Sequence, residues 1–483
     1  MSRAAGGHRG ASAASSAYER LRAAHLCTVQ AALEDHIARL EWPRERIERY
    51  RDQRLRAFLA YARERSPFYA ARLRDLDPST ATTADLAMLP VLTKRDVMDE
   101  WDAIVTVPGL DRETAERALA GQTWYSYTPA GQQVFSSGGS SGVRGVYVWD
   151  WDLYVTLACL AWRTQAREER LSRPLLRERP RLAVLEAGKP PHAGTPLFDI
   201  PTVPGMDTAV IPAGAPFGEI LAAVAAARPT HLVGFPSVVG RLARAALAGE
   251  LEISPVRVST NSEPLTYEDR QVIRDAWNVP IHNLWGSTEI GVQAVGCARA
   301  EGLHVCEDEV VLERVDEAGT PVAPDEPAAR VLATGLANLT FPFIRYDLGD
   351  EVTYLSGQCP CGSRFVRLAN VAGRRDDDFY YPGCTVPAGV FRHVLGVDPR
   401  LSEYQVRQTA NGAEILAVGS PDTAGLAASL TAALRSLGLP DPQVQIRAVD
   451  RIQRNAATGK LRRFIALTDS SKRPVSQADR NGS

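Results

Sequence analysis

A run of serine and glycine over residues 136–142, Ser-Ser-Gly-Gly-Ser-Ser-Gly, has the composition of a loop that binds polyphosphate. Glycines leave the backbone N–H groups unobstructed and the serine hydroxyls add further donors, so such a loop can wrap closely around phosphate oxygens. Loops of glycine and serine are equally common as flexible surface turns. The segment alone leaves both interpretations open.

A second segment, Asn283–Glu289, places an aromatic ring, two hydroxyls and a carboxylate at the end of a short apolar run. Trp285 can stack on a base, the Thr288 hydroxyl can reach phosphate, and Glu289 can hold Mg²⁺ through oxygen. The same Ser-Thr-Glu sequence is a common beginning of a helix. Taken alone, this segment favours the structural interpretation.

Three charged segments follow, at Arg345–Asp350, at residues 373–377 and at residues 458–463. Each is individually typical of a turn or a solvated charge cluster. Arginine supplies nearly all the positive charge, and the chain has only four lysines, at positions 94, 189, 460 and 472. Lys460 belongs to the last charged segment. Lys94 and Lys189 have no comparable context, and we expect both on the surface.

The seven cysteines are an odd number in a long chain, which is a poor basis for a disulfide framework. Two clusters instead offer the ligands of a closed tetrahedral zinc site, namely Cys297, His304, Cys359 and Cys361. Cys306 is a competing ligand, and scattered reduced thiols are the alternative. The other three, Cys27, Cys159 and Cys384, are expected to be apolar fillers.

Composition limits the classes of protein that remain. The chain has 483 residues, of which 45% are hydrophobic and 23% charged, as in a globular protein of two or three domains. Its net charge of −2 excludes the electrostatic footprint of a dedicated nucleic-acid binder. No apolar run approaches the roughly 20 residues needed to span a bilayer. The first residues lack the apolar centre of a secretory signal, so we expect a cytoplasmic protein.

The patterning predicts an α/β fold with a large N-terminal domain of helix-covered, mainly parallel sheets and a small α+β C-terminal domain, which the resemblance described below implies to be mobile. Residues 18–73 have helical spacing, with a new helix beginning at Pro43. From Val134 on, strands alternate with helices, which is the βαβ rhythm of a parallel sheet. The clearest strands are residues 182–185, 231–234 and 256–259, and the clearest helices are residues 217–227 and 238–248. The predicted divisions are a disordered tail at 1–17, domains at 18–372 and 373–466, and a second disordered tail at 467–483.

The order and spacing of these segments resemble the adenylate-forming superfamily of acyl-CoA synthetases, adenylation domains and luciferases, and most closely its phenylacetate–CoA ligase-like branch. Residues 137–142 stand at the Ser-Ser-Gly-Thr-Thr-Gly loop of that branch, and residues 285–289 match its Tyr-Gly-Ser-Thr-Glu. Residues 345–350, 373–377 and 459–460 match its Arg-Tyr-Arg-Thr-Gly-Asp, Gly-Arg-x-Asp-Asp and Gly-Lys motifs, and Cys359–Gly362 its Cys-Pro-Cys-Gly. The resemblance covers roughly residues 45–465.

The resemblance implies a set of roles for ATP and Mg²⁺. The β- and γ-phosphates would be held by Ser137, Gly139, Ser140, Ser141 and Gly142. Thr288 would contact the α-phosphate, Glu289 would hold Mg²⁺, and Asp350 with Arg374 would bind the ribose. The adenine and its surroundings would involve Ser262, Glu263, Trp285, Gly286 and Ser287.

The resemblance also implies how the acid is handled. Lys460 would bridge the substrate carboxylate and the nucleotide, and catalysis would rest on it together with Thr288 and Glu289. The acid pocket would be lined by Phe235, Pro236 and Asn261. Asp376 would be the hinge of the small domain, and the four Cys/His ligands would hold a structural Zn²⁺.

The expected activity is adenylation of a carboxylic acid, of aryl or arylacetic type, followed by transfer to CoA or to the phosphopantetheine of an acyl carrier protein. Transfer to an amine, activation of a small inorganic acid such as nitrite, and a non-catalytic nucleotide-binding scaffold are the alternatives. Expected partners are a small-molecule acid, with a carrier protein or a second copy of the chain left open, and neither nucleic acid nor membrane. Departures from the family pattern, among them Gly138, Arg144 and Leu348, leave the acid unidentified.

Overall fold

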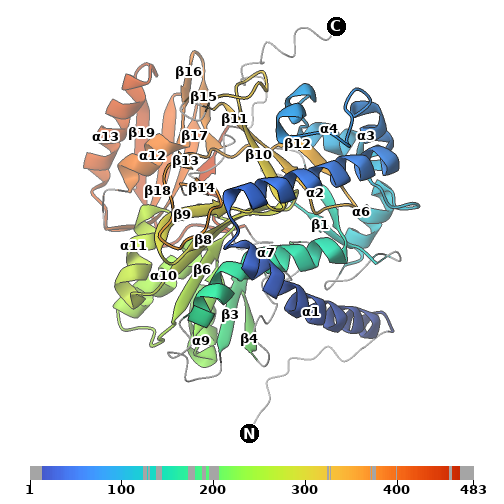
Figure 1. The fold of residues 1–483 in the computed structure, drawn as a ribbon. Coiled ribbons are helices and arrows are strands. Elements are labelled where there is room, and N and C mark those ends of the chain that lie inside the picture. Colours follow the sequence, from blue (N-terminus) through green and yellow to red (C-terminus); the bar gives the residue numbers. More distant parts are fainter. Residues whose placement is uncertain are drawn as a thin grey trace.

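The computed structural model describes residues 13–122, 128, 131–137, 144–171, 180–187, 192–194, 206–323, 326, 328–369, 371, 377–396, 398, 400–455 and 460–467. Figure 1 shows a large body, coloured blue to yellow, and a smaller C-terminal unit, orange to red, at its upper left. This division into a large and a small unit agrees with the predicted fold class.

Helices make up the N-terminal segment. They are α1 (Ala13–Arg39), α2 (Arg44–Arg65), α3 (Pro67–Arg72), the 3₁₀ helix η1 (Thr83–Met88), α4 (Lys94–Asp99), α5 (Trp101–Ile104) and α6 (Arg112–Ala120). Pro43 is the N-cap of α2, which confirms the helix start predicted there. Helix α1 already begins at Ala13, inside the predicted tail at 1–17. Within the described residues, none of the helices combines the length and the apolar character needed to cross a membrane.

The centre of the large body is a nine-stranded sheet with the order β13-β14-β9-β8-β7-β6-β5-β3-β4. Its parallel part consists of β3 (Arg181–Glu186), β4 (Asp207–Pro212), β5 (His231–Gly234), β6 (Arg257–Asn261) and β7 (Ile281–Ser287). Helices connect these strands, namely α9 (Phe217–Ala227), α10 (Pro236–Leu247) and α11 (Tyr267–Trp277). The predicted alternation of strands and helices is confirmed over this part, and α9 has the predicted bounds.

The rest of the large body is antiparallel. The sheet continues through β8 (Gly291–Cys297), β9 (Ala300–Val305), β13 (Tyr354–Leu355) and β14 (Arg367–Leu368). Separate from it are the pair β1 (Gln133–Ser136) and β2 (Val146–Trp149) and the three-stranded sheet β10 (Val310–Val315), β11 (Arg330–Gly335) and β12 (Phe343–Asp347). Within the nine-stranded sheet, the parallel pairs are thus those of the βαβ segment.

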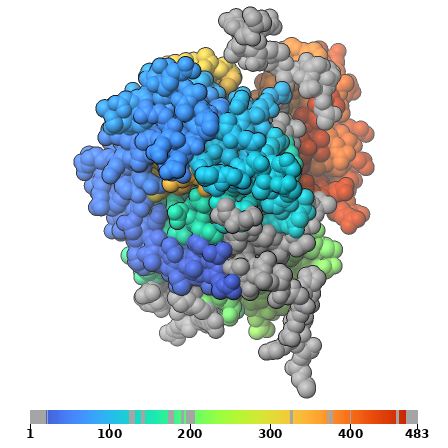
Figure 2. Space-filling model, turned by 90° about the vertical axis from the view of Figure 1, so that its right-hand side faces the viewer, coloured from blue at the N-terminus to red at the C-terminus, as the bar shows by residue number. Residues whose placement is uncertain are grey.

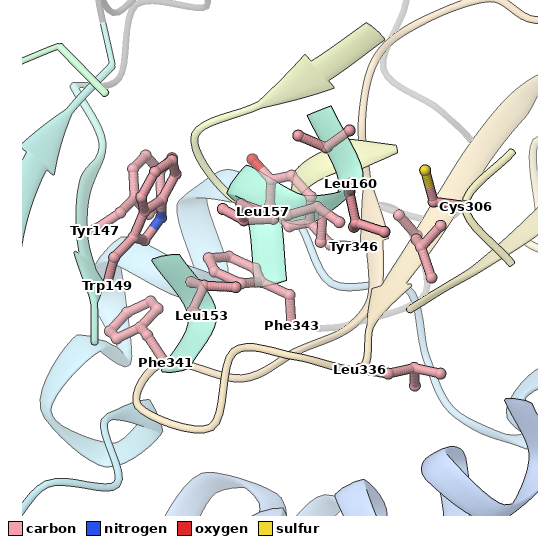
Figure 3. Packing of buried hydrophobic residues seen from close by; sticks show 14 of the residues in the cluster. Tyr147, Trp149, Leu153, Leu157, Leu160, Cys306, Leu336, Phe341, Phe343 and Tyr346 are labelled. Atoms are coloured by element: carbon pink, nitrogen blue, oxygen red, sulfur yellow. The ribbon is translucent and has the colours of Figure 1, made fainter. Parts of the chain in front are cut away.

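The long helix α7 (Trp151–Leu171) crosses the main core. Figure 3 shows leucines of α7 among the aromatic side chains of β2 and β12. The rings of Tyr147 and Phe343 are 5.9 Å apart, and those of Phe343 and Tyr346 are 5.2 Å apart. This packing fixes β2 against β12, and both strands carry residues of the site described below.

A buried ion-pair network attaches α1 to the body. Arg163 on α7 donates two hydrogen bonds to Asp308, at 2.6 and 2.9 Å, and Arg39 on α1 reaches the same carboxylate at 3.3 Å. The Asp308 side chain is fully buried, so its charge has to be paired, and Arg39 also pairs with the neighbouring Glu309 at 2.9 Å. The N-terminal helix is therefore fixed by charge as well as by apolar contact.

The small unit has its own hydrophobic core. Its described residues lie between positions 377 and 467. Its strands are β15 (Phe379–Tyr381), β16 (Cys384–Val386), β17 (Leu401–Thr409), β18 (Gly412–Gly419), β19 (Gln443–Ala448) and β20 (Phe464–Ile465), with helices α12 (Ala388–Leu395) and α13 (Thr423–Ser436). The sheet β19-β18-β17-β20 packs on these helices around Phe379, Phe391 and Phe464. In the view of Figure 2 this unit, in orange and red, is seen at the right-hand edge of the molecule.

Candidate functional site

The site is built where the parallel strands end. Glu186 ends β3, Phe235 follows β5, Asn261 ends β6, and Trp285 lies near the end of β7. The carboxyl ends of parallel strands meet at one edge of a sheet, which is where α/β proteins bind ligands. Chain positions that lie about a hundred residues apart are therefore neighbours here.

The small unit brings Lys460 to this edge. The Lys460 ammonium nitrogen lies 5.4 Å from the centre of the Phe235 ring, and its charge also acts on the buried Glu186 carboxyl. An ammonium over an aromatic face is held by the ring quadrupole. Lys460 therefore lies beside Phe235, one of the three predicted pocket residues; a second, Pro236, begins α10 directly after it in the chain.

Glu263 fixes the segment that carries Lys460. Its two oxygens accept hydrogen bonds from the backbone N–H of Leu461 at 2.8 Å and from that of Ser237 at 3.3 Å. Arg454 adds a hydrogen bond to the Ser237 hydroxyl at 2.9 Å. Glu263, predicted to lie near the nucleotide, thus joins the small unit to the large one in this arrangement. Its neighbour Ser262 has φ of +64°, a backbone conformation that functional sites often hold.

Glu289, the predicted Mg²⁺ ligand, is held by two tyrosines. One of its oxygens accepts from the Tyr147 hydroxyl at 2.7 Å and from the Tyr346 hydroxyl at 3.2 Å. Burial, and then the Glu289 charge, raise the pKa of both phenols, so both remain protonated donors. The carbonyl of Thr288 accepts from the Trp149 indole at 3.0 Å. The end of β7 is therefore oriented by β2 and β12.

The two tyrosines were not among the predicted site residues. Tyr147 follows the Gly/Ser loop, and Tyr346 lies inside the Arg345–Asp350 segment. The only indication in the sequence that these tyrosines belong to the site was their position next to, or inside, the predicted motifs. Their partner Glu289 lies 142 and 57 residues away along the chain, so only the tertiary pairing identifies it.

We expect the substitution Tyr147→Phe to raise the Mg²⁺ concentration needed for half-maximal pyrophosphate release by roughly threefold to tenfold, because one hydrogen bond to a charged group is lost. A titration with Mg²⁺ measures this shift. The control is Tyr267→Phe, since the Tyr267 side chain is exposed on α11. An unchanged Mg²⁺ requirement would show that the hydroxyl does not orient Glu289.

The Lys94 ammonium lies at Ser137, the first residue of the predicted phosphate loop, and the sequence did not suggest this contact. Lys94 donates to the Ser137 hydroxyl at 2.8 Å, and the backbone N–H of Gly145 donates to the same oxygen at 3.3 Å. The expectation that Lys94 is an ordinary surface residue is therefore wrong. Arg144, in contrast, pairs with Glu116 at 2.7 Å on an exposed face.

Trp285 and Asp350 meet inside the site. The indole N–H of Trp285 donates to an Asp350 oxygen at 2.9 Å, and both side chains are buried. This bond orients the carboxylate predicted to bind ribose, and leaves the indole ring to line the site. Gly286 and Ser287 follow at the end of the same strand.

The four predicted zinc ligands form one cluster. The sulfur atoms of Cys297 and Cys359 are 3.6 Å apart, and the sulfur of Cys361 is 3.4 Å from His304 Nε2. All four ligand atoms lie within 4.8 Å of one another. A tetrahedral zinc with Zn–S of about 2.3 Å and Zn–N of about 2.0 Å has edges of about 3.5–3.8 Å, so the donors fit that ion.

The local backbone explains the cluster. Cys297 ends β8, His304 lies on β9, and the Cys359–Gly362 knuckle folds back beside them. The N–H of Gly362 bonds the Cys359 carbonyl at 3.0 Å, and its φ of +87° suits glycine. Cys306 is not part of the cluster, and burial raises the pKa of its thiol to about 12. His304, and not Cys306, completes the group of four side chains that could hold a metal ion. Of the three predicted fillers, Cys159 and Cys384 are buried, but Cys27 is exposed.

Some predicted residues lie outside the described part of the chain. They are Gly139, Ser140, Ser141, Gly142, Arg374 and Asp376. Their assigned roles stay predictions from the sequence.

Comparison with known proteins gives a consistent picture. The scan of protein-family models found no match. The chain is 26% identical over 377 residues to a phenylacetate–coenzyme A ligase of Thermus thermophilus, covering 75% of this chain and 78% of that protein. It is 27% identical over 154 residues to the protein CapK of Staphylococcus aureus, covering 31% and 32%.

Solved structures share the fold. A 2-hydroxyisobutyryl-CoA ligase in its postadenylation state, bound to an acyl-AMP, matches with a TM-score of 0.68 at 17% identity, covering 90% of this chain and 92% of that one. The same ligase in its thioesterification state gives 0.55 at 18% identity, covering 89% and 91%. Both structures of that ligase therefore share the fold of this chain.

Proposed function

Because the chain belongs to the adenylate-forming superfamily, in its phenylacetate–CoA ligase-like branch, we propose that it is an AMP-forming acid–CoA ligase. The observation that supports this most strongly is the position of Lys460 at the carboxyl edge of the sheet, beside Phe235 and close enough to Glu186 for its charge to act on that carboxyl group. A compact ammonium on a flexible stem can neutralise two anions that must approach each other. Those anions are the acid and the α-phosphate of ATP.

In the first step a carboxylate oxygen of the acid attacks the α-phosphorus of ATP, and pyrophosphate leaves. Lys460 would hold the two reacting anions together, and Thr288 would steady the α-phosphate. Glu289, fixed by its two tyrosines, would hold Mg²⁺, which supplies neutralisation of the phosphate charge. The Ser137 hydroxyl, supported by Lys94, would face the departing phosphates.

In the second step the thiolate of CoA attacks the acyl carbon and AMP leaves. The segment that carries Lys460 is tied to the large unit through the hydrogen bond from the Leu461 backbone N–H to Glu263. Rotation of the small unit about Asp376 would withdraw Lys460 and make room for the thiol. The zinc site would then be structural, since its four protein donors leave no open position for chemistry.

We expect the substitution Asp376→Pro to preserve acid-dependent pyrophosphate release and to lower thioester formation roughly a hundredfold, because proline restricts the backbone rotation at a hinge. Both half-reactions should be followed in the same preparation. The substitution Asp376→Ala is the control, since it removes the carboxylate and keeps the backbone free. If proline reduced both steps equally, the hinge assignment would fail.

The acid and the acceptor are tested together. Wild-type protein is given ATP, Mg²⁺ and, one at a time, benzoates, phenylacetates, small hydroxy acids and nitrite, and pyrophosphate release is measured. Each acid that supports release is then offered CoA, a phosphopantetheinyl carrier protein and an amine. We expect an organic acid and CoA. Release with nitrite alone, or transfer to the amine alone, would replace this proposal by one of the alternatives.

A further inference from the structure

A buried carboxyl group lies in the acid pocket without an assigned role. Glu186 is the last residue of β3, and its side chain is only 2% exposed. It lies at the same sheet edge as Phe235 and Asn261, which end or follow the neighbouring strands. A carboxyl group this deeply buried is rare unless it has a partner.

The hydrogen bonding of the Glu186 carboxyl group is incomplete. On one side the backbone closes over it, because a Cβ on Gly194 would lie 2.8 Å from its Oε2. Its Oε1 has no well-formed hydrogen bond to the described residues, and the same is true of both polar atoms of the Asn261 amide. Burial raises the pKa of Glu186 to about 7, opposed by the nearby Lys460 charge and the Asn261 amide. A buried acceptor with incomplete hydrogen bonding, and the Asn261 amide beside it, thus lie at the sheet edge where the ligand is expected.

We propose that Glu186 is a specificity-determining residue that selects carboxylic acids bearing an amino or hydroxyl group next to the carboxyl group. This inference rests on the proposed function, because it assumes that Lys460 binds the carboxyl group of the acid. The donor hydrogen of the substituent would bond Glu186 Oε1, and the Asn261 amide would complete its hydrogen bonding.

The charges of Glu186 and of the substrate carboxyl group determine where on the acid the hydrogen-bond donor has to be. Lys460 is close enough to Glu186 for its charge to favour the carboxylate form, so the acid bound by Lys460 brings a second carboxylate near the first. Two carboxylates without a proton between them repel each other in a buried site. A donor adjacent to the substrate carboxyl group can bridge the two oxygens. A donor at the far end of the acid would not reach this position.

Glu186 could instead act only on Lys460, as a positioning residue that holds the ammonium. The two roles predict different kinetics. Substitution of a positioning residue lowers kcat/KM for every acid by a similar factor. Substitution of a residue that hydrogen-bonds the substituent changes the ratio of kcat/KM between substituted and unsubstituted acids.

The test compares acids in matched sets: 2-aminobenzoate, 4-aminobenzoate and benzoate; 2-hydroxybenzoate, 4-hydroxybenzoate and benzoate; and mandelate with phenylacetate. Pyrophosphate release is measured for wild type, Glu186→Gln, which keeps the shape, and Glu186→Leu, which removes the acceptor. The control is Glu219→Gln, an exposed acid on α9. Thermal unfolding of each variant accompanies the kinetics.

We expect wild type to prefer the acids whose donor adjoins the carboxyl group. Glu186→Gln and Glu186→Leu should lower kcat/KM for these acids tenfold to a hundredfold and leave or raise that of benzoate or phenylacetate. A parallel fall for all acids, no change, or a wild-type preference for the unsubstituted acids would overturn the inference. If no acid released pyrophosphate with wild type, the proposed function itself would fail.

Discussion

The substitution Lys460→Ala should reduce acid-dependent ATP–pyrophosphate exchange by roughly a hundredfold to a thousandfold while the protein remains folded. The ammonium lies at the sheet edge beside Phe235, and the residue is partly buried. The other lysine that the structure describes, Lys94, lies at Ser137 instead. Removing a preorganised positive group from a reacting phosphate typically has an effect of this size. Exchange measures the first half-reaction alone, so a slow second step does not obscure the result.

The matched control for Lys460 is Arg462→Ala, two residues further along the same segment, where the side chain is exposed. We expect this variant to retain exchange. If Lys460→Ala exchanged at the wild-type rate, the residue would not act in adenylation, and the position of the small unit would have another meaning.

The substitution Cys359→Ser should remove bound zinc and destabilise the large unit. The site ties β8 and β9 to the knuckle through four donors, so loss of one thiolate leaves an incomplete tetrahedron. A loss of roughly 3 kcal/mol, at about 2 °C per kcal/mol for a unit of this size, lowers Tm by about 6 °C. Metal analysis and a thermal melt measure the two effects.

The exposed Cys27 provides the control for zinc, because Cys27→Ser changes a cysteine outside the cluster. It should keep both the metal and the melting temperature. Zinc content that was unchanged in Cys359→Ser would reject the assignment of this ligand. A chelator that failed to lower the Tm of wild type would show that the metal does not support the fold.

Local patterns were enough to predict the parallel part of the fold. Strands β3 and β5 and helix α9 stand where β-branched runs and an Ala/Leu-rich stretch predicted them, because such segments form the same element in any context. The clustering of Cys297, His304, Cys359 and Cys361 was predictable for a chemical reason, since these residue types in this spacing are typical of a metal site; zinc itself stays a prediction. The antiparallel strands were not predicted one by one; the pairing of β9 with β14, for example, joins His304 to Arg367, which lie far apart in the chain.

Contacts that depend on tertiary packing were not predictable. Lys94 meets Ser137 across 43 residues, which only the placement of α4 beside β1 allows. Glu263 accepts a hydrogen bond from Leu461 of the small unit, so its role depends on how the small unit packs against the large one. Glu186 ends an apolar strand, where its sequence context suggests nothing but a strand end. Each of these residues acts through a partner that the local pattern does not name.

The most direct test of the central proposal uses an acid that supports pyrophosphate release, labelled with ¹⁸O in both carboxyl oxygens. Wild-type protein is given this acid, ATP, Mg²⁺ and CoA, and the products are analysed by mass spectrometry. Attack of the carboxylate on the α-phosphorus, followed by thiol attack on the acyl carbon, leaves one ¹⁸O in AMP and one in the thioester. We expect this distribution, and AMP without label would contradict the proposed reaction.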